Sequence, residues 1–279
     1  MTESGTENPG ETLACLVIDD PLIRPKYGCL DYKRLLDEMK AHNFFTEIAF
    51  IPWNCRRTNA ETAHLLANNT ENFSICVHGC NHTGNEFGGG NYQKLRALSS
   101  TALWHMEQHK RLTGLPYDPV FVFPQGRFSS VAMRALKDEG YFAAVNSDLR
   151  ATDREEPPAR EYQQPATTIY YDFPLFLRRY PKDRSRFVQD IEWGRPIIIV
   201  EHHGVFRNGY KAMTDLVDWV NSLGKIRWTS LLGIAEHYLG NKAPITQQIP
   251  KPLPSHLALN VKVALRRFLS ETRDNYYRN

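Results

Sequence analysis

Short apolar runs alternate with stretches of helical periodicity along most of this chain, and this alternation restricts its fold more than any other feature. The apolar runs of strand length cover residues 13–18, 44–51, 73–78, 120–123, 141–145 and 196–200. The alternation of strand and helix repeats at least six times, which indicates parallel strands joined by right-handed crossovers. We therefore predict an α/β fold, open or barrel-like, with the carboxyl ends of its strands on one face.

Length and composition are those of an ordinary globular protein. The chain has 279 residues, 42% hydrophobic and 23% charged, enough for one large α/β domain or two small ones. We predict a disordered N-terminal tail over residues 1–11, a main domain over 12–240 and a further segment over 241–279 that begins as a Pro-rich strap. The acidic tail lacks the features of a secretory signal, and the five cysteines include no Cys-x-x-Cys motif. Both observations favour a cytoplasmic location.

Two pairs of ionisable residues stand where buried strands are expected to end. One apolar run leads into Asp19-Asp20, and another leads into His78 and His82, which are four residues apart. Two histidines and one carboxylate form a common zinc-binding set that leaves a position open for water. Each motif alone has an ordinary alternative: a helix-capping Asp, or two histidines in a surface loop. Their joint position at strand ends favours a metal site.

Charge is spread unevenly along the chain. The net charge of +3 divides into +4 over residues 251–279 and −1 over the remainder, so the main domain has no basic footprint for nucleic acid. Residues 257–273 carry an apolar stripe at helical spacing beside a basic stripe of Lys262, Arg266 and Arg273. Such a helix either packs on the main domain or makes a peripheral contact with an anionic membrane surface.

With these motifs placed, the sequence resembles the polysaccharide deacetylases, the NodB-homology proteins of carbohydrate esterase family four. The resemblance covers about residues 12–240. The Asp-Asp pair, the His-x-x-x-His motif, the turn Pro124-Gln125-Gly126 and the strand that ends at His202 match family motifs in order and in strand context. The resemblance implies a distorted (β/α) barrel of about seven parallel strands with helices outside.

The resemblance also implies roles for the site residues. Asp20, His78 and His82 would hold one divalent metal ion, with zinc as the expected ion, and a metal-bound water would have a pKa of about 7. Asp19 would be the general base, and His202 would protonate the departing amine. The backbone N–H of Gln125 would stabilise the oxyanion together with the metal.

Strand geometry separates neighbouring side chains in two of these motifs. Adjacent residues of an extended segment point apart, so we expect only one of Asp19 and Asp20 to ligate the metal. The same alternation places Glu201 and His203 on the face opposite His202, although the sequence leaves open which histidine is the acid.

Three positions depart from the family pattern. Val122 stands where the family usually has an Arg, Gln125 replaces an aromatic residue, and Pro21 replaces a Gly. The missing Arg normally orients the catalytic Asp. Either another group performs this role here, with Asp148 as one candidate, or catalysis is weakened.

The expected function is metal-dependent hydrolysis of an N-acetyl amide on a sugar or glycan precursor, including nucleotide- or lipid-linked ones. Two alternatives remain: a degenerate deacetylase that binds metal or glycan without turnover, and a hydrolase of a non-sugar amide. The sequence does not identify the sugar, the acyl group, the metal or the oligomeric state.

Overall fold

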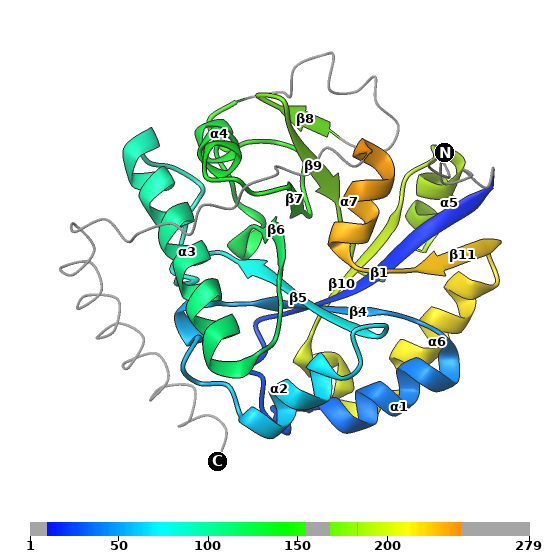
Figure 1. Ribbon diagram of the computed structural model, residues 1–279. Helices are drawn as coiled ribbons and strands as arrows, with labels where there is room; N and C mark the ends of the chain where they lie inside the picture. Colours follow the sequence, from blue (N-terminus) through cyan, green and yellow to red (C-terminus); the bar gives the residue numbers. More distant parts are fainter. Residues whose placement is uncertain (1–9, 155–167, 183, 241–279) are drawn as a thin grey trace, which may run out of the picture.

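A nine-stranded sheet forms the centre of the computed structural model, which describes residues 10–154, 168–182 and 184–240 (Figure 1). The strands run in the order β10-β1-β4-β5-β6-β7-β9-β8, and β11 pairs with β1. Their bounds are β1 Glu11–Asp19, β4 Thr46–Phe50, β5 Phe73–His78, β6 Asp118–Val122, β7 Ala143–Asn146, β8 Thr168–Tyr170, β9 Phe173–Leu177, β10 Ile197–His202 and β11 Lys225–Trp228. A small hairpin, β2 Lys26–Tyr27 and β3 Leu30–Asp31, follows β1.

Seven of the described strands follow one another in parallel around a ring: β10, β1, β4, β5, β6, β7 and β9. The ring closes just beyond β9, where Arg179 forms a parallel bridge with Ile199 of β10. The Arg179 N–H donates to the carbonyl of Ile198 at 2.8 Å, and the Arg179 carbonyl accepts from the Val200 N–H at 3.0 Å. The predicted distorted barrel of about seven parallel strands is confirmed.

Helices connect the strands, and five of the described helices (α1, α2, α3, α4 and α7) begin at a residue whose side chain caps the first turn. The Asp31 side chain accepts hydrogen bonds from the first turn of α1, and Asn59 and Asn91 cap α2 and α3 in the same way. The Ser230 side chain caps α7 by accepting from the Gly233 N–H. The helix bounds are α1 Tyr32–His42, α2 Ala60–Ala67, α3 Tyr92–Thr113, α4 Ser130–Asp138, α5 Ser185–Glu192, α6 Lys211–Asn221 and α7 Leu231–Leu239.

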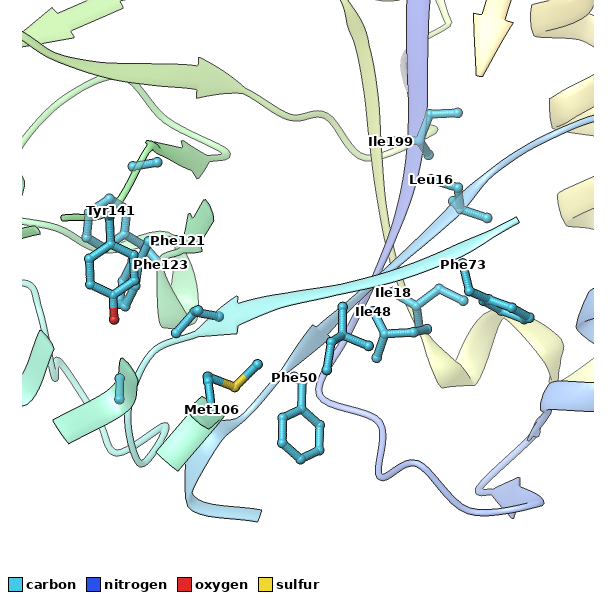
Figure 2. Close-up of a cluster of buried hydrophobic side chains, with 14 of the residues drawn as sticks. Leu16, Ile18, Ile48, Phe50, Phe73, Met106, Phe121, Phe123, Tyr141 and Ile199 are labelled. Atoms are coloured by element: carbon cyan, nitrogen blue, oxygen red, sulfur yellow. The ribbon is translucent and has the colours of Figure 1, made fainter. Parts of the chain in front are cut away.

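Both faces of the barrel strands are buried, so the strands read as continuous apolar runs rather than as alternating ones. In β1, Leu16 and Ile18 belong to the outer layer between strands and helices, together with Ile48, Phe73 and Ile199 (Figure 2). The intervening residues of β1, Leu13, Cys15 and Val17, face the barrel interior. Inward residues are therefore every second residue of each strand, and this parity fixes which side chains can reach a site inside the barrel.

Helix α7 packs against the barrel interior at the end where the strands begin. Leu231, Ile234 and Ala235 lie in the same buried cluster as Leu13 and Cys15. The fully buried Glu47 accepts a hydrogen bond from the Leu231 N–H at 3.0 Å and another from the Ser74 hydroxyl. Because α7 seals this end, the end where the strands finish is the one left for chemistry.

Two segments differ from the expectations or lie beyond the description. The hairpin of β8 and β9 falls where the sequence analysis predicts no strand, and the described residues 149–154 before it contain neither helix nor strand. The predicted strap and amphipathic helix over 241–279, and most of the predicted tail over 1–11, lie outside the described residues and stay predictions.

In the described part of the chain, no helix combines the length and apolar character needed to cross a bilayer.

The carboxyl groups under α7 generate a prediction about pH and stability. Burial, with the neighbouring Asp118 charge, raises the pKa of Glu47 well above its usual range, and burial raises the pKa of Asp118 to about 6. A raised folded-state pKa contributes stability that is complete at low pH and is lost as the pH rises from about 4 through the folded pKa. Glu47→Gln should therefore lose less free energy of unfolding between pH 5 and pH 8 than the wild type, measured by urea titration. Exposed Glu61→Gln is the control, and a wild-type pH slope in Glu47→Gln would contradict the assignment.

Candidate metal centre

His78 is the last residue of β5 and is held in a metal-ligating orientation. Its Nδ1 lies 3.1 Å from the Val122 carbonyl oxygen on the neighbouring strand β6. A carbonyl can only accept, so Nδ1 carries the proton and Nε2 keeps its lone pair. The side chain is 1% exposed, and Nε2 lies 3.2 Å from Oδ1 of Asp20. Val122, which stands where the family usually has an Arg, thus orients His78 through its main-chain carbonyl.

His82 and Asp20 complete a cluster with His78. The His82 Nε2 is also 3.2 Å from Asp20 Oδ1, and one ligand atom from each of the three residues lies within 4.8 Å of the others. Asp20 and His82 both adopt left-handed backbone conformations, with φ of 71° and 55°. Such conformations cost about 1 kcal/mol or more in non-glycine residues and are found at functional sites.

The left-handed turn at Asp20 also corrects the prediction that adjacent carboxylates point apart. The chain leaves the strand after Asp19, so the two side chains no longer alternate. Both carboxylates approach His78: its Nε2 lies 3.2 Å from Asp20 and 3.9 Å from Oδ2 of Asp19.

Asp19 is held by a buried arginine that the sequence analysis missed. Arg178 follows β9, and its Nη1 and Nη2 donate to Oδ1 and Oδ2 of Asp19 at 2.6 and 2.8 Å. The side chains of Arg178 and Asp19 are 2% and 4% exposed. The pairing is the bidentate geometry that fixes a carboxylate most firmly. Arg178 therefore supplies the group that the sequence lacks at Val122.

Asp148, one candidate for the orienting group, does not take this role, because Arg178 holds Asp19. Asp148 lies in the exposed loop after β7, where its carboxylate accepts from the Arg150 N–H at 3.0 Å. Its carbonyl accepts from the Asn146 side chain at 2.8 Å.

Two further predicted residues lie at the rim. The Nε2 of His202, the last residue of β10, is 3.9 Å from Oδ2 of Asp20, and its side chain is 48% exposed. His203 instead packs edge-on against Tyr27, so the structure directs only His202 toward the cluster. The ring of Tyr180, which the sequence analysis did not single out, lies parallel to the His202 ring, with 6.5 Å between the ring centres.

Gln125, the predicted oxyanion residue, has a left-handed backbone with φ of 57°, and its Oε1 accepts from the Asn85 N–H at 3.2 Å.

A second missed residue, Glu86, organises the loop between the two histidines. Its buried carboxylate accepts from the N–H groups of Cys80 at 2.9 Å, Asn81 at 2.8 Å and His82 at 3.3 Å. Gly79 is required beside it: φ is +63°, and a Cβ there would lie 2.4 Å from Pro124 and 2.7 Å from the Glu86 carboxylate. The Gly in the His-Gly-x-Asn-His motif therefore lets this carboxylate approach the backbone.

The residues present fit a divalent cation. Two imidazole nitrogens converge on the buried Asp20 Oδ1, which has no hydrogen-bond partner of regular geometry in the described residues. Burial alone would raise the pKa of Asp20, but His78, His82 and His202 lower it overall. Burial alone would lower the pKa of His78, but Asp19 and Asp20 raise it. The carboxylates of Asp19 and Asp20 attract positive charge to the His78 side chain, and a metal ion can take the place of a proton at its Nε2. Two histidines with one carboxylate suit zinc.

Comparisons with known proteins place the fold. No protein-family model matches the sequence, and no curated protein has a significant match to it. Among solved structures, a candidate polysaccharide deacetylase from Mycobacterium smegmatis superposes with a TM-score of 0.56 at 16% identity, over 84% of this chain and 92% of the other. The chain has the polysaccharide deacetylase fold. This confirms the resemblance seen in the sequence.

Two other structures with this fold are less similar. The peptidoglycan deacetylase PdaC from Bacillus subtilis covers 82% of this chain and 93% of its own length, at 10% identity and a TM-score of 0.47. A family 4 carbohydrate esterase from Streptomyces lividans, in complex with acetate, covers 79% and 93% at 10% identity and a TM-score of 0.47.

Glu86 generates a prediction about metal affinity. Glu86→Gln keeps the side-chain shape but loses one acceptor oxygen for the backbone N–H groups that position His82. We expect zinc affinity, measured by chelator competition, to fall about 10–100-fold, as is typical when a supporting group of a metal site is lost. The matched control is Glu107→Gln. Glu107 lies on α3, and its carboxylate accepts a hydrogen bond from the Tyr117 hydroxyl. Equal zinc affinities of Glu86→Gln and the wild type would show that Glu86 does not position His82 for metal binding.

The arginine at β9 generates a second prediction. Arg178→Met leaves the buried Asp19 carboxylate unpaired, which should lower the free energy of unfolding by about 3–5 kcal/mol. Adding Val122→Arg should recover part of this loss, because Val122 faces the barrel interior and is the position where the family carries its arginine. Urea unfolding of both single variants and the double variant measures the coupling.

The three variants also define the result that would contradict this role. Val122→Arg alone should lower the free energy of unfolding, since a second guanidinium would enter a buried space beside Arg178. A double variant no more stable than the additive sum of the single variants would show that the two positions do not share one role.

Proposed function

We propose that this protein is a metal-dependent deacetylase that hydrolyses an N-acetyl amide on a sugar or glycan. The observation that carries the proposal is the joint geometry of the Asp20, His78 and His82 cluster and the Asp19 carboxylate held by Arg178. A fold alone does not fix a function, but a carboxylate fixed beside a three-ligand cluster is the arrangement that amide hydrolysis needs. A divalent ion held there, zinc by its donor set, supplies Lewis acidity.

The chain's own residues can then divide the reaction between them. Asp19 accepts a proton from the attacking water, and Arg178 holds the carboxylate group in a fixed orientation while it does so. The backbone N–H of Gln125 donates to the carbonyl oxygen as negative charge develops there. His202 protonates the nitrogen as the carbon–nitrogen bond breaks, and acetate and a free amine leave. The proximity of His202 to Asp20 and its exposure to solvent support this role.

The identity of Asp19 as the base is tested by Asp19→Asn. This variant keeps the shape of the side chain but cannot accept the proton, so acetate release from N-acetylated sugars should fall about 10²–10⁴-fold. Bound zinc, measured by elemental analysis, should stay near wild type. His78→Ala, His82→Ala and Asp20→Ala should instead lose most of the metal.

The exposed Asp215→Asn on α6 is the charge-matched control and should retain full turnover. Circular dichroism melts establish that each variant is folded. Wild-type turnover in Asp19→Asn would reject Asp19 as the base. Full zinc occupancy without acetate release from any sugar would favour a binding protein, and release from non-sugar amides alone would favour a different hydrolase.

A further inference from the structure

Asn146, the last residue of β7, is fully buried and has no part in the proposed chemistry so far. Its side-chain Nδ2 donates to the Gly126 carbonyl at 3.0 Å and to the Asp148 carbonyl at 2.8 Å. Both protons of the amide are therefore committed to main-chain oxygens. The first of these oxygens belongs to the turn Pro124–Gly126, which carries the Gln125 N–H and which we call the oxyanion turn.

The orientation of the Asn146 amide follows from its neighbours. If the group were turned over, its oxygen would face two carbonyl oxygens, and all three can only accept. In the orientation that makes both hydrogen bonds, Oδ1 is buried and accepts from no group in the described residues. A buried acceptor without a donor lowers stability. Stability alone therefore does not explain an asparagine at this position, and the unpaired oxygen points to a role for the amide.

Asn146 lies behind the oxyanion turn rather than on the metal side. Val145 belongs to the buried cluster inside the barrel, whereas Ala144 belongs to the outer layer. Strand alternation places the Asn146 side chain on the outer side with Ala144. Because this side chain is also fully buried, it does not touch a substrate at the metal centre. Any effect of Asn146 on the reaction must therefore pass through the turn.

The backbone of the oxyanion turn needs an external support. Gln125 and Gly126 are both left-handed, with φ of 57° and 65°. A left-handed residue other than glycine persists only where its surroundings hold it. Within the turn, the Gly126 N–H donates to the Phe123 carbonyl at 3.3 Å, which is longer than the 3.0 Å bond from Asn146. Among the described residues the Gln125 N–H has no acceptor of its own, so it is available to a ligand.

The main chain of Asn146 contacts a second part of the site. Its carbonyl accepts from the Arg178 N–H at 2.9 Å, and the Arg178 side chain holds Asp19. One residue therefore contacts both the turn with the oxyanion donor and the arginine that fixes the general base. These two groups must act on one substrate at the same time, and such an arrangement tolerates errors of only about 0.5 Å.

We propose that Asn146 is a positioning residue that holds the Gln125 N–H where it can donate to the developing oxyanion, in register with the pair of Arg178 and Asp19. The inference rests on the proposed function, because it assigns the role through the same reaction. The hold of Asn146 on the oxyanion turn, in contrast, can be measured without turnover.

Two substitutions test this role. Asn146→Ala removes both donors, and Asn146→Asp keeps the shape but sets a carboxylate oxygen against the Gly126 carbonyl. Both variants should lower the kcat of acetate release, from the best of a panel of N-acetylated sugars, about 10–100-fold, because a small misplacement of an oxyanion donor has an effect of this size. KM and zinc content should stay within about twofold of wild type. The pH profile should keep its shape, because the contact with Arg178 is made by main-chain atoms.

Asn69 provides the matched control. Its Nδ2 donates to the Leu65 carbonyl at 2.8 Å, and its own carbonyl accepts from the Phe73 N–H, where β5 begins. This is the end of the barrel away from the metal centre. Asn69→Ala and Asn69→Asp should therefore keep the wild-type kcat. Circular dichroism melts establish that all four variants are folded at the assay temperature.

The results that would overturn the proposal differ from those of a merely structural role. Wild-type kcat in both Asn146 variants overturns it while the proposed function stands. A fall in turnover accompanied by an equal loss of zinc, or by an equal rise in KM, also overturns it. If the wild type releases no acetate at all, the proposed function fails. Nuclear magnetic resonance of the backbone amides then decides the hold on the turn: the Gln125 signal should shift in Asn146→Ala but not in Asn69→Ala, and an unchanged Gln125 signal rejects it.

Discussion

The buried ion pair of Asp19 and Arg178 is the interaction on which the candidate site depends. Taking two charges out of water costs several kcal/mol for each ion, and attraction offsets this only when the geometry is very good. Here two hydrogen bonds of 2.6 and 2.8 Å join the end of β1 to the end of β9, with β10 between them in the ring. Such a pair is weak support for stability as such. Its effect is to fix the plane and position of a carboxylate 3.9 Å from His78.

Polarity inside the barrel follows from where each inward residue lies along its strand. The middle of the interior is apolar, with Val17, Cys76 and Val145 in one cluster. Polar residues occupy the two ends. Glu47 lies where the strands begin and is covered by α7, whereas Asp19 and His78 lie where the strands finish. Parity and strand length therefore separate a sealed end from an end at which solvent-exposed His202 can meet a substrate.

Much of this arrangement could be predicted from the sequence, because local patterns determine it. Apolar runs placed β1, β5 and β10, and the ionisable residues at their ends identified Asp20, His78 and His82 as neighbours. Arg178 could not be found in this way. The strand before it, β9, contains Pro174, and a proline inside a sequence run argues against a strand. The same strand also comes after a long polar stretch of the sequence. More importantly, closure of the ring brings β9 near β1, and no local signal encodes that contact.

The two carboxylates show a second limit of pattern reasoning. Alternation predicts that Asp19 and Asp20 diverge, but this holds only while the backbone stays extended. The left-handed conformation of Asp20 breaks the alternation, so the side chains of Asp19 and Asp20 both approach His78. Glu86 is comparable, because three backbone N–H groups gather around it only once the loop is folded. Strained backbone and loop anchors are tertiary properties, and they are concentrated at the site.

The arginine lies on the β9 side rather than at Val122 of β6, where the resemblance leads one to expect it, and this position affects the whole wall of the barrel. Val122 pairs with His78 across adjacent strands and supplies a carbonyl to its Nδ1, so β6 now orients a histidine and keeps an apolar side chain. On β9, the main chain of Arg179 closes the ring against β10 and thereby fixes the residue before it. Arg178 therefore enters the interior next to the residue whose main chain closes the ring. Its neighbour points outward to Asp190, and one strand end places a guanidinium on each side of the wall.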